Sequence, residues 1–462
     1  MELLEKAVDI IKSMGASSLL PLTVVFLSIC FGVKIGRAIR SGLMIGAGFV
    51  GINLIVEMMN NQLGEAAVKM SERLGLSLQV VDLGWQGVAP MAWASGIAAI
   101  GIPLAVFINI LMLSLKLTRT INIDLWNIWH MIFTGALAYT VTGKLWIGIL
   151  GVAVHAAFAY KLGDLWAPFI GGYFELTGLT VPHGTSAYMA PIACLTDAVI
   201  EKIPGLRKIN FSIEQLQEKA GVLAEPVVLG GIMGTMIGLL AGDRVDHAFS
   251  LGVQMSAVMI LMPQIVKCIM DGLLPLSERA KKLLVPSTPQ DNSSGRLPWS
   301  QHLDGGEVYI GLDPAVLLGD SQVVTAGLLF IPLTLVIAML LPGNKVLPFG
   351  DLATISFFIA ISVAIHKGNL FRTLISGSLI MTLTLWITNQ TIPWISALAK
   401  ETGTLSGGGM ATAMDQGGSP ISYIFVELFK RDQPWGLLAV GAFYVICMIA
   451  AVKYSKAEKL KN

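Results

Sequence analysis

The sequence predicts an all-α polytopic membrane protein with about eleven transmembrane helices and several re-entrant hairpins. Charged residues make up 13% of the 462 residues and hydrophobic residues 54%, whereas about a quarter of an ordinary soluble domain is charged. Six long runs contain no Asp, Glu, Lys or Arg: 13–33, 83–115, 176–196, 321–344, 373–399 and 433–452. A charge-free apolar run of about 20 residues matches the ~30 Å hydrocarbon core of a bilayer.

Composition excludes several other classes of protein. The formal net charge is +1, so no overall positive field attracts nucleic acid. The four cysteines, at positions 30, 194, 268 and 447, are far apart, which argues against a disulfide framework or a metal cluster. The first apolar run is long and lacks an upstream basic cluster, so we expect a membrane span rather than a cleaved signal peptide.

Eleven segments have the composition of membrane spans. They lie near residues 16–33, 42–59, 96–115, 125–143, 145–162, 223–242, 247–268, 323–341, 351–366, 370–389 and 435–452. Gly, Pro, Ser and Thr interrupt four further apolar segments, 83–95, 176–200, 308–320 and 404–427. Irregular backbone at membrane depth is tolerated only where protein buries it or where it lines a cavity. We therefore predict that these four segments are re-entrant.

Positive charges in short loops predict the orientation. Lys and Arg residues follow the first, third, ninth and last spans, at 34–40, 116–119, 367–372 and 453–461. All four groups are cytoplasmic if the N-terminus is outside and the C-terminus inside. Lys430 and Arg431 are a mild exception on the outer side. The polar segment 277–307, rich in Pro, Ser, Asn and Gly, is predicted to be a flexible cytoplasmic linker.

The two halves of the chain resemble each other. Ile-Pro-Leu at 102–104 corresponds to Ile-Pro-Leu at 331–333, Asp124 corresponds to Asp351, and the glycine-rich 182–186 falls where 407–420 lies in the second half. Gly-rich membrane segments can look alike by chance, but here order, spacing and identities agree. Five full spans in each unit, an odd number, would invert the second unit. Inverted repeats with broken helices are typical of transporters whose substrate binds near the midplane.

This repeat predicts the domain organisation. The first unit would be 1–222, with scaffold helices at 16–59 and a core at 83–200. The second would be 223–434, with scaffold helices at 223–268 and a core at 308–428. A final helix and a basic cytoplasmic tail would follow at 435–462.

Ionisable groups at membrane depth are costly and usually functional. His183 lies in a charge-free run between Pro182 and Gly184, which imply non-helical backbone with N–H and C=O groups facing a ligand, and Thr185 follows. Asp313 precedes a proline that starts a helix, so an N-cap and a ligand contact are equally good interpretations. Asp351 could equally cap the ninth span.

Four more polar residues lie in interrupted segments or at the start of a span. Asp415 and Gln416 open Asp-Gln-Gly-Gly-Ser-Pro, which we interpret as a re-entrant tip rather than an outer turn. Asn127 and His130 are three residues apart and share a helix face, although the tryptophans beside them also fit interfacial anchors.

Other polar and aromatic residues have a structural interpretation of equal or greater weight. Trp93 and Ser95 could offer a ring and a hydroxyl to a ligand, but a packing role fits them equally well. His155 and His366 are single histidines within predicted helices and are more typical of interhelical hydrogen bonds than of ligand contacts.

The motifs of an independent enzyme or pump do not occur in the sequence. It has no GxxxxGK[ST] loop, no HExxH and no GxSxG. The candidate side chains are Asp, His, Asn, Gln and Ser. They suit a neutral ligand with many hydroxyls, because each hydroxyl needs both a donor and an acceptor. We expect no cofactor, no metal and no independent catalytic activity.

Longer motifs, in order along nearly the whole chain, resemble the galactitol-type enzyme IIC, the membrane component of the phosphoenolpyruvate-dependent sugar phosphotransferase system, in the ascorbate–galactitol superfamily. In the first half they are Val-Val-Asp-Leu-Gly-Trp (80–85), Asp-Leu-Trp-Asn-Ile-Trp-His-Met (124–131) and Pro-His-Gly-Thr-Ser-Ala-Tyr-Met (182–189). In the second half they are Gly-Leu-Asp-Pro-Ala (311–315), Leu-Pro-Phe-Gly-Asp-Leu-Ala-Thr-Ile (347–355) and Met-Asp-Gln-Gly-Gly-Ser-Pro-Ile (414–421).

This resemblance implies a homodimer in the bacterial cytoplasmic (inner) membrane. Each protomer would have a fixed dimerisation domain and a mobile core that carries galactitol across the bilayer by an elevator movement. A separate cytoplasmic IIB protein, phosphorylated through IIA, would donate phosphate from a phosphocysteine to give galactitol 1-phosphate.

The residues and the resemblance together predict a polyol-binding site, made of Trp93, Ser95, Asn127, His130, His183, Gly184, Thr185, Asp313, Asp351, Asp415 and Gln416. Either His183 or Asp313 could accept the hydroxyl proton. An ion-coupled polyol symporter and a passive polyol channel remain as alternatives. A substrate that is another hexitol or a pentitol also remains open, because one changed hydroxyl contact can switch preference.

Overall fold

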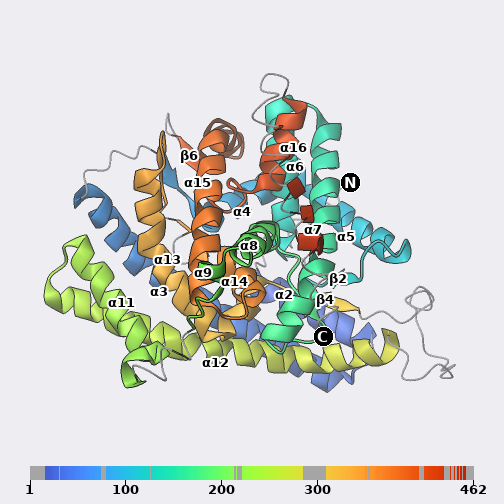
Figure 1. Cartoon of the computed structure of the whole chain (residues 1–462). Coiled ribbons are helices and arrows are strands. Elements are labelled where there is room, and N and C mark those ends of the chain that lie inside the picture. The colour runs from blue at the N-terminus through green and yellow to red at the C-terminus, as the bar shows by residue number, and fades with distance from the viewer. Residues whose placement is uncertain are drawn as a thin grey trace.

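The computed structural model describes residues 16–30, 32–73, 80–124, 126–212, 215, 221–284, 308–348, 350–351, 354–404, 410–430 and some positions between 438 and 453. They form a mainly helical protein with two small sheets (Figure 1). The predicted linker beyond residue 284, the final span at 435–452 and the basic tail lie wholly or largely outside the described residues.

The helices of the two halves follow each other in a similar order. In the first half they are α2 (Ala16–Cys30), α3 (Ile35–Arg73), α4 (Gly84–Ala94), α5 (Ala98–Ser114), η1 (Trp126–Ile128), α6 (Trp129–Thr142), α7 (Leu145–Tyr173), α8 (Ser186–Ile200), α9 (Pro204–Arg207) and η2 (Gly221–Ala224). In the second half they are α11 (Pro226–Ala241), α12 (Val245–Leu284), η4 (Pro314–Gly319), α13 (Ser321–Leu340), α14 (Ile355–Ile365), α15 (Leu370–Glu401) and α16 (Pro420–Phe429).

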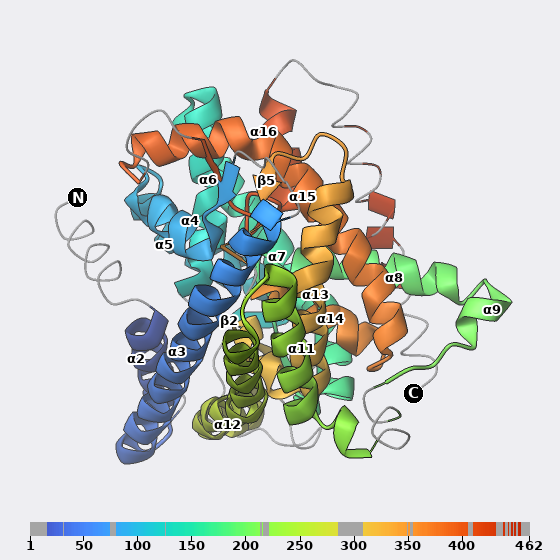
Figure 2. The same ribbon diagram turned by 90° about the vertical axis from the view of Figure 1, so that its left-hand side faces the viewer.

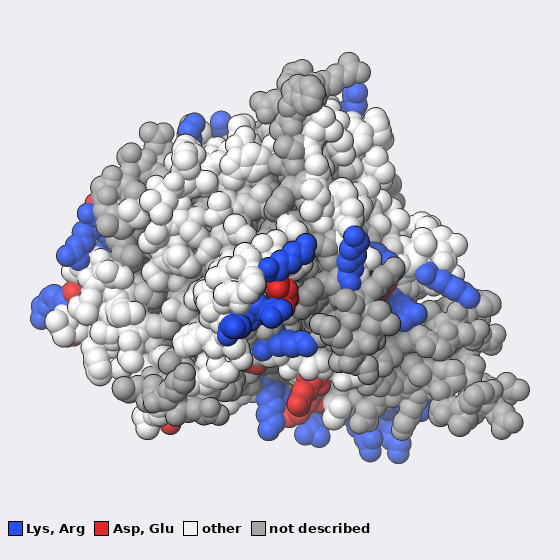
Figure 3. Space-filling view, viewed as in Figure 1, with Lys and Arg blue, Asp and Glu red and all other residues white. Residues whose placement is uncertain are grey.

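The apolar helices agree with a polytopic membrane protein. Within the described residues, α7, α13 and α15 are each long and apolar enough to cross a bilayer, and α4 and α5 qualify together although the chain bends by 95° between them. Figure 3 shows a face that is mostly uncharged, with many of its Lys and Arg side chains in the lower half. The predicted number of eleven spans stays a prediction.

Several helices extend beyond the predicted spans. α7 continues to Tyr173, α15 to Glu401 and α12 to Leu284, which takes α12 into the segment predicted as linker. In α7 and α12 charged residues interrupt the apolar run before the helix ends, whereas in α15 the charge-free run continues to residue 399. The residues that follow in α12, Ser-Glu-Arg-Ala-Lys-Lys-Leu-Leu, are mostly good helix formers. A charged residue therefore ends the apolar run without ending the helix.

Two helical hairpins, α2–α3 and α11–α12, pack together on one side of the molecule (Figure 2). α11 approaches α12 through glycines spaced four apart. A Cβ added at Gly234 would lie 2.7 Å from the Leu251 carbonyl oxygen, and one added at Gly238 would lie 2.7 Å from the Ala248 Cα. Small residues at such positions let helix backbones approach closely inside a membrane.

An ion pair joins these hairpins beyond the apolar runs. The Lys69 ammonium lies 2.8 Å from Asp243 Oδ1 and 2.7 Å from Glu65 Oε1. These two acceptors raise the pKa of Lys69 above its ordinary value, with Asp243 contributing most. Arg73 Nη1 donates to the Leu239 carbonyl near the end of α11.

Six short strands form two parallel sheets, which the all-α prediction did not include. They are β1 (Val80–Asp82), β2 (Thr120–Asn122), β3 (Leu179–Thr180), β4 (Tyr309–Gly311), β5 (Val346–Leu347) and β6 (Ala411–Thr412). The orders are β5-β1-β6 and β2-β4-β3, so each sheet places a strand of one half between two strands of the other. Strands of two or three residues are too short to show an alternating pattern.

Sheet register fixes which segments meet. In the first sheet Val80 pairs with Val346 and Val81 with Ala411. In the second, Thr120 pairs with Tyr309 and Leu179 with Ile310. Strand β3 is followed by α8, and strand β6 is followed by α16. The sheets therefore set the positions of the two loops that join each strand to its helix.

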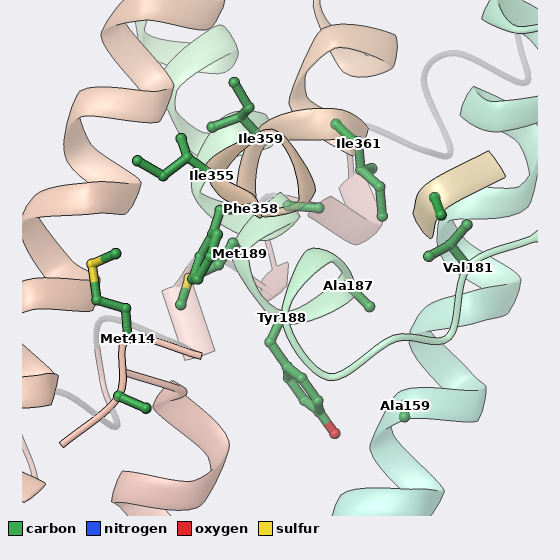
Figure 4. Packing of buried hydrophobic residues seen from close by; sticks show 14 of the residues in the cluster. Ala159, Val181, Ala187, Tyr188, Met189, Ile355, Phe358, Ile359, Ile361 and Met414 are labelled. Atoms are coloured by element: carbon green, nitrogen blue, oxygen red, sulfur yellow. The ribbon is translucent and has the colours of Figure 1, made fainter. Parts of the chain in front are cut away.

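Buried apolar side chains pack around these loops. Figure 4 shows Met189 of α8 beside Phe358 of α14, with Ile359 further along α14, Tyr188 of α8 pointing away from α14, and Met414 in the neighbouring segment. All five side chains are almost fully buried. Trp166 Nε1 donates to the Ala187 carbonyl at 3.0 Å, and the Tyr188 hydroxyl donates to the His155 carbonyl at 2.8 Å, so these two buried polar groups are satisfied. A well-packed interior has little room to relax, so the loops have a rigid support.

A second ion-pair cluster joins the end of α8 to the start of α15, which follows the basic segment predicted to be cytoplasmic. Arg372 Nη1 lies 2.7 Å from Asp197 Oδ1 and 2.7 Å from Glu201 Oε1. The Leu370 N–H donates to the Phe211 carbonyl at 2.7 Å. His366 contacts Asp197 through Nδ1 and Ser376 through Nε2, which confirms the interhelical role predicted for it.

Candidate functional site

Two loops, one from each half of the chain, meet at the start of α6. The loop between β3 and α8 contains Gly184, and the loop between β6 and α16 contains Gln416. A Cβ added at Gly184 would lie 2.8 Å from Gln416 Nε2 and 2.9 Å from His130 Cβ, so only glycine allows this approach. Gln416 has a φ of 58°, a left-handed conformation that is unusual for a residue other than glycine.

A cluster of buried polar side chains occupies this meeting point. Thr185 Oγ1 donates to Asp415 Oδ1, and Gln416 Nε2 donates to the same oxygen at 3.1 Å. His130 Nε2 lies 3.8 Å from Asp415 Oδ2. The His130 and His183 rings are 4.1 Å apart and meet edge to face. The structure therefore brings together five candidate residues that the sequence places far apart.

Hydrogen bonds to the backbone favour opposite tautomers for the two histidines. The Asn127 carbonyl can only accept, so His130 Nδ1, at 2.8 Å, carries a proton and a neutral ring leaves Nε2 as an acceptor. The Thr185 N–H donates to His183 Nδ1 at 3.3 Å, so the proton of the neutral His183 ring lies on Nε2. One ring thus offers an acceptor and the other a donor.

The His130 ring is held in place on both sides. It stacks on Trp129 at 3.9 Å between ring centroids and contacts His183 on its other side. Behind it, Thr134 Oγ1 lies 2.7 Å from His155 Nδ1, which agrees with the interhelical role predicted for His155.

A second polar group, from the first half and the start of η4, adjoins this centre. Asn127 Nδ2 lies 2.5 Å from Asp124 Oδ2 and 2.5 Å from Asp313 Oδ2. Asp313 also caps η4, because its Oδ1 accepts from the Ala315 N–H at 2.6 Å. The capping interpretation of Asp313 is confirmed, and the same carboxylate faces Asn127.

Two fully buried carboxylates fix the loop that carries Asp415. Asp82 accepts the N–H groups of Gly84, Asp351 and Met414 at 2.9–3.1 Å. Asp351 accepts the N–H groups of Trp85 at 3.0 Å and Asp415 at 2.7 Å. The alternative that Asp351 caps the ninth span is wrong, because the N-cap of α14 is Thr354.

Sequence reasoning missed Asp82 and Asp124 as site residues. Both carried a signal: Asp82 lies in the motif Val-Val-Asp-Leu-Gly-Trp, and Asp124 aligns with Asp351 in the internal repeat. Both are buried, with 0% and 4% exposure.

The remaining predicted residues, Trp93 and Ser95, lie at the end of α4. Ser95 Oγ donates to the Ala92 carbonyl at 2.6 Å, so its hydroxyl is occupied locally. The Trp93 side chain belongs to the hydrophobic core. Both observations agree with the packing interpretation, and a ligand contact for either residue stays a prediction.

The cluster retains open hydrogen-bonding capacity. Within the described residues, the buried atoms His130 Nε2, Gln416 Oε1 and Ser419 Oγ have no hydrogen-bond partner. Such groups are rare in native structures and call for an explanation, of which a ligand is one. No group of three or more His, Cys, Asp and Glu in the described part of the chain is arranged to hold a metal ion.

Comparison with known proteins identifies the family. The model of the PTS system sugar-specific permease component matches residues 9–409. The chain belongs to this family.

Two relatives from Escherichia coli strain K12 support this family assignment. The permease is 49% identical over 435 residues to the protein described as "PTS system galactitol-specific EIIC component", covering 94% of this chain and 93% of the relative. It is 36% identical over 395 residues to a "Putative permease IIC component", covering 86% and 87%. The family predicted from the sequence motifs is confirmed, and with the apolar helices it makes the permease a multi-pass inner-membrane protein.

Proposed function

We propose that the permease binds galactitol at the cluster around His130, His183 and Asp415 and carries it across the inner membrane for phosphorylation by phospho-IIB. The substrate is taken from the relative that is 49% identical over nearly the whole chain and is described as galactitol-specific. The PTS family implies cytoplasmic IIB and IIA partners.

One observation supports the position of the site more than any other. Side chains from both halves meet there and leave His130 Nε2 and Gln416 Oε1 buried without a partner among the described residues. An acceptor on His130 beside a donor on His183 suits a hydroxyl, which donates and accepts at once. Asp415 adds a carboxylate 3.8 Å from His130. The described contacts of these side chains include no Lys or Arg, which fits a neutral polyol.

The same arrangement suggests which group takes the proton. When phosphoryl transfer occurs, the terminal hydroxyl oxygen forms a bond to phosphorus, the S–P bond of the IIB phosphocysteine breaks, and the thiolate leaves. The hydroxyl proton must go to a base within hydrogen-bond reach. His130 Nε2 has the lone pair for it. The sequence-based candidates, His183 and Asp313, are less suited, because Nε2 of His183 already carries a proton and Asp313 is engaged in capping η4.

Release of the product follows from charge. Galactitol 1-phosphate carries about two negative charges near neutral pH. The cluster holds several carboxylates, so the phosphorylated product is repelled and leaves towards the cytoplasm.

The proposed movement is an elevator in a homodimer with the N-terminus outside. The α2–α3 and α11–α12 hairpins would form the fixed dimerisation scaffold, and the remaining helices would move as the core. The matching orders β5-β1-β6 and β2-β4-β3 support two repeated units, because exchanging the halves converts one sheet into the other. Their inversion is taken from the odd number of predicted spans in each unit. Arg372, from a basic segment predicted to be cytoplasmic, pairs with Asp197 and Glu201 at the end of α8, which supports a common cytoplasmic side for the two helix ends.

The binding site is tested with purified protein and a panel of galactitol, sorbitol, mannitol and arabitol. His130→Gln, Asp415→Asn and the control His247→Gln are compared by thermal shift and calorimetry. His247 is exposed on α12, away from the cluster. We expect each site variant to lose about 10-fold or more in galactitol affinity, since one hydrogen bond to a charged or well-placed partner contributes about 1.5–3 kcal/mol. If both site variants bind galactitol with wild-type affinity, the binding site lies elsewhere and the proposed position is wrong.

A transport assay separates the proposal from its rivals. Proteoliposomes containing the permease alone should not accumulate galactitol, and adding IIA, IIB and phosphoenolpyruvate with the general phosphotransferase proteins should produce galactitol 1-phosphate. Accumulation driven by a proton or sodium gradient without IIB would instead favour a symporter.

A further inference from the structure

An apolar groove runs along the outer surface of α8 and α15, away from the polar cluster. It has a volume of about 520 Å³. Among the described residues, Ile192 and Val199 of α8 and Ile375, Leu379 and Trp386 of α15 line it. Cavities of this size are large enough for a small-molecule ligand.

The two threonine hydroxyls of the lining are already satisfied. Thr196 Oγ1 donates to the Ile192 carbonyl at 2.7 Å, and Thr382 Oγ1 donates to the Ser378 carbonyl at 2.7 Å. Both bonds lie within a single helix. The groove therefore offers mainly hydrocarbon contact and no free donor from these threonines, which suits an acyl chain better than a polyol.

The length of the groove matches one leaflet of a bilayer. From Ile375 to Trp386 the lining follows α15 for about 16 Å at 1.5 Å per residue. Half of a ~30 Å hydrocarbon core is about 15 Å. Because α15 begins at the basic segment around Arg372, the groove lies in the leaflet on that side.

One end of the groove has a basic rim. Ile203 and Leu206 line the groove, and the exposed residues Lys202, Arg207 and Lys208 flank them in the chain. Arg372 pairs with the neighbouring Glu201 at 2.7 Å. Of the ion pairs that the described residues form, none includes the three rim cations. In Figure 3, Lys and Arg side chains gather near α8 and α9, below a mostly uncharged surface.

We propose that the groove binds one acyl chain of an anionic glycerophospholipid from the cytoplasmic leaflet, whose phosphate contacts Lys202, Arg207 and Lys208. The apolar wall fits the chain, and the three cations match the negative headgroup. A zwitterionic lipid could fill the groove but would gain less from the rim, because anionic headgroups attract each nearby Lys or Arg. This site is independent of the polyol cluster.

Trp386 provides a reporter inside the groove. Full-length permease is reconstituted in phosphatidylcholine nanodiscs that contain increasing fractions of brominated phosphatidylglycerol or, separately, brominated phosphatidylcholine. Bromine on an acyl chain quenches nearby indole fluorescence. The part of the fluorescence that comes from Trp386 is obtained by subtracting the signal of Trp386→Phe from that of the native protein.

We expect this part to be quenched in a saturable way by brominated phosphatidylglycerol at low mole fraction, and only in proportion to bulk content by brominated phosphatidylcholine. Equal quenching by both lipids would mean ordinary solvation by bulk lipid and would overturn the proposal. Quenching by neither would mean that protein fills the groove, with the same consequence. These outcomes use native side chains at the rim, so they do not depend on whether a rim variant folds.

Charge variants test the headgroup contact. We expect the triple variant Lys202→Gln, Arg207→Gln, Lys208→Gln to weaken the apparent affinity for brominated phosphatidylglycerol about 10- to 100-fold. The matched control is Lys34→Gln, Arg37→Gln, Arg40→Gln, which removes three exposed cations at the start of α3 and its preceding turn. An equal loss in both triples would reflect net charge alone and would contradict a built site.

Discussion

Asp351→Asn should weaken galactitol binding although Asp351 lies behind the proposed ligand position. The Asp351 carboxylate accepts the Trp85 N–H on one oxygen at 3.0 Å and the Asp415 N–H on the other at 2.7 Å. An asparagine has one oxygen, so its NH₂ group must face one of these donors. At least one hydrogen bond to a charged acceptor is lost, at a cost of about 1.5–3 kcal/mol. If the loop carrying Asp415 shifts in response, that cost corresponds to about a 10- to 100-fold weaker affinity.

The assay is calorimetric titration of galactitol into purified permease, together with thermal unfolding without ligand. The matched control is Asp164→Asn. Asp164 Oδ1 likewise accepts several groups, from Thr118, Arg119 and Thr120, but in a different part of the fold. Both variants should unfold at lower temperature, and only Asp351→Asn should lose affinity. An affinity for Asp351→Asn within twofold of the native value, or an equal loss in Asp164→Asn, would refute the positioning argument.

Three further predictions follow from contacts in the structure. Gly184→Ala should reduce galactitol affinity about 5- to 100-fold, since its Cβ would overlap His130 and overpacking costs about 1–3 kcal/mol. Calorimetry checks this against the control Gly172→Ala, whose Cβ meets nothing within 4 Å. Equal affinities in the two variants would contradict the prediction. Gly234→Val should lower the unfolding temperature by forcing α11 away from the Leu251 carbonyl, and an unchanged melting curve would argue against this packing. Arg372→Gln should destabilise the protein by about 3 kcal/mol, because the buried Asp197 loses its cationic partner and keeps only the contact with His366. Adding Asp197→Asn should recover part of the loss in thermal unfolding.

Membrane character and several residues of the buried polar cluster could be predicted from local sequence. The charge-free runs predicted the apolar helices, and the Pro and Gly on either side of His183 predicted non-helical backbone at that residue. Helix ends were harder to predict. α12 continues past its apolar run to Leu284 because the charged residues that follow are good helix formers, and α15 continues past Pro393 to Glu401. The short strands had no signal at all, since two paired residues form no periodic pattern.

Contacts between distant segments explain what the sequence could not give. The role of Asp82 depends on N–H groups at 351 and 414, and nothing near Asp82 in the chain indicates these partners. The internal repeat held a partial clue, because it aligned Asp124 with Asp351. His130 and His183 come from the first half of the chain and Asp415 from the second, so their contact depends on how the two halves pack together. Local sequence does not indicate this packing.

The interlocked sheets have a consequence for biogenesis. Val81 cannot find its partner Ala411 until the ribosome has made most of the chain, and β4 in turn requires β2 and β3 from the earlier part. Long sequence separation between paired segments delays folding. The nascent permease must therefore stay in the bilayer with one edge of β1 unpaired, and with Asp82 lacking the N–H group of Met414, until translation is nearly finished. During this period the chain is most exposed to membrane chaperones and proteases.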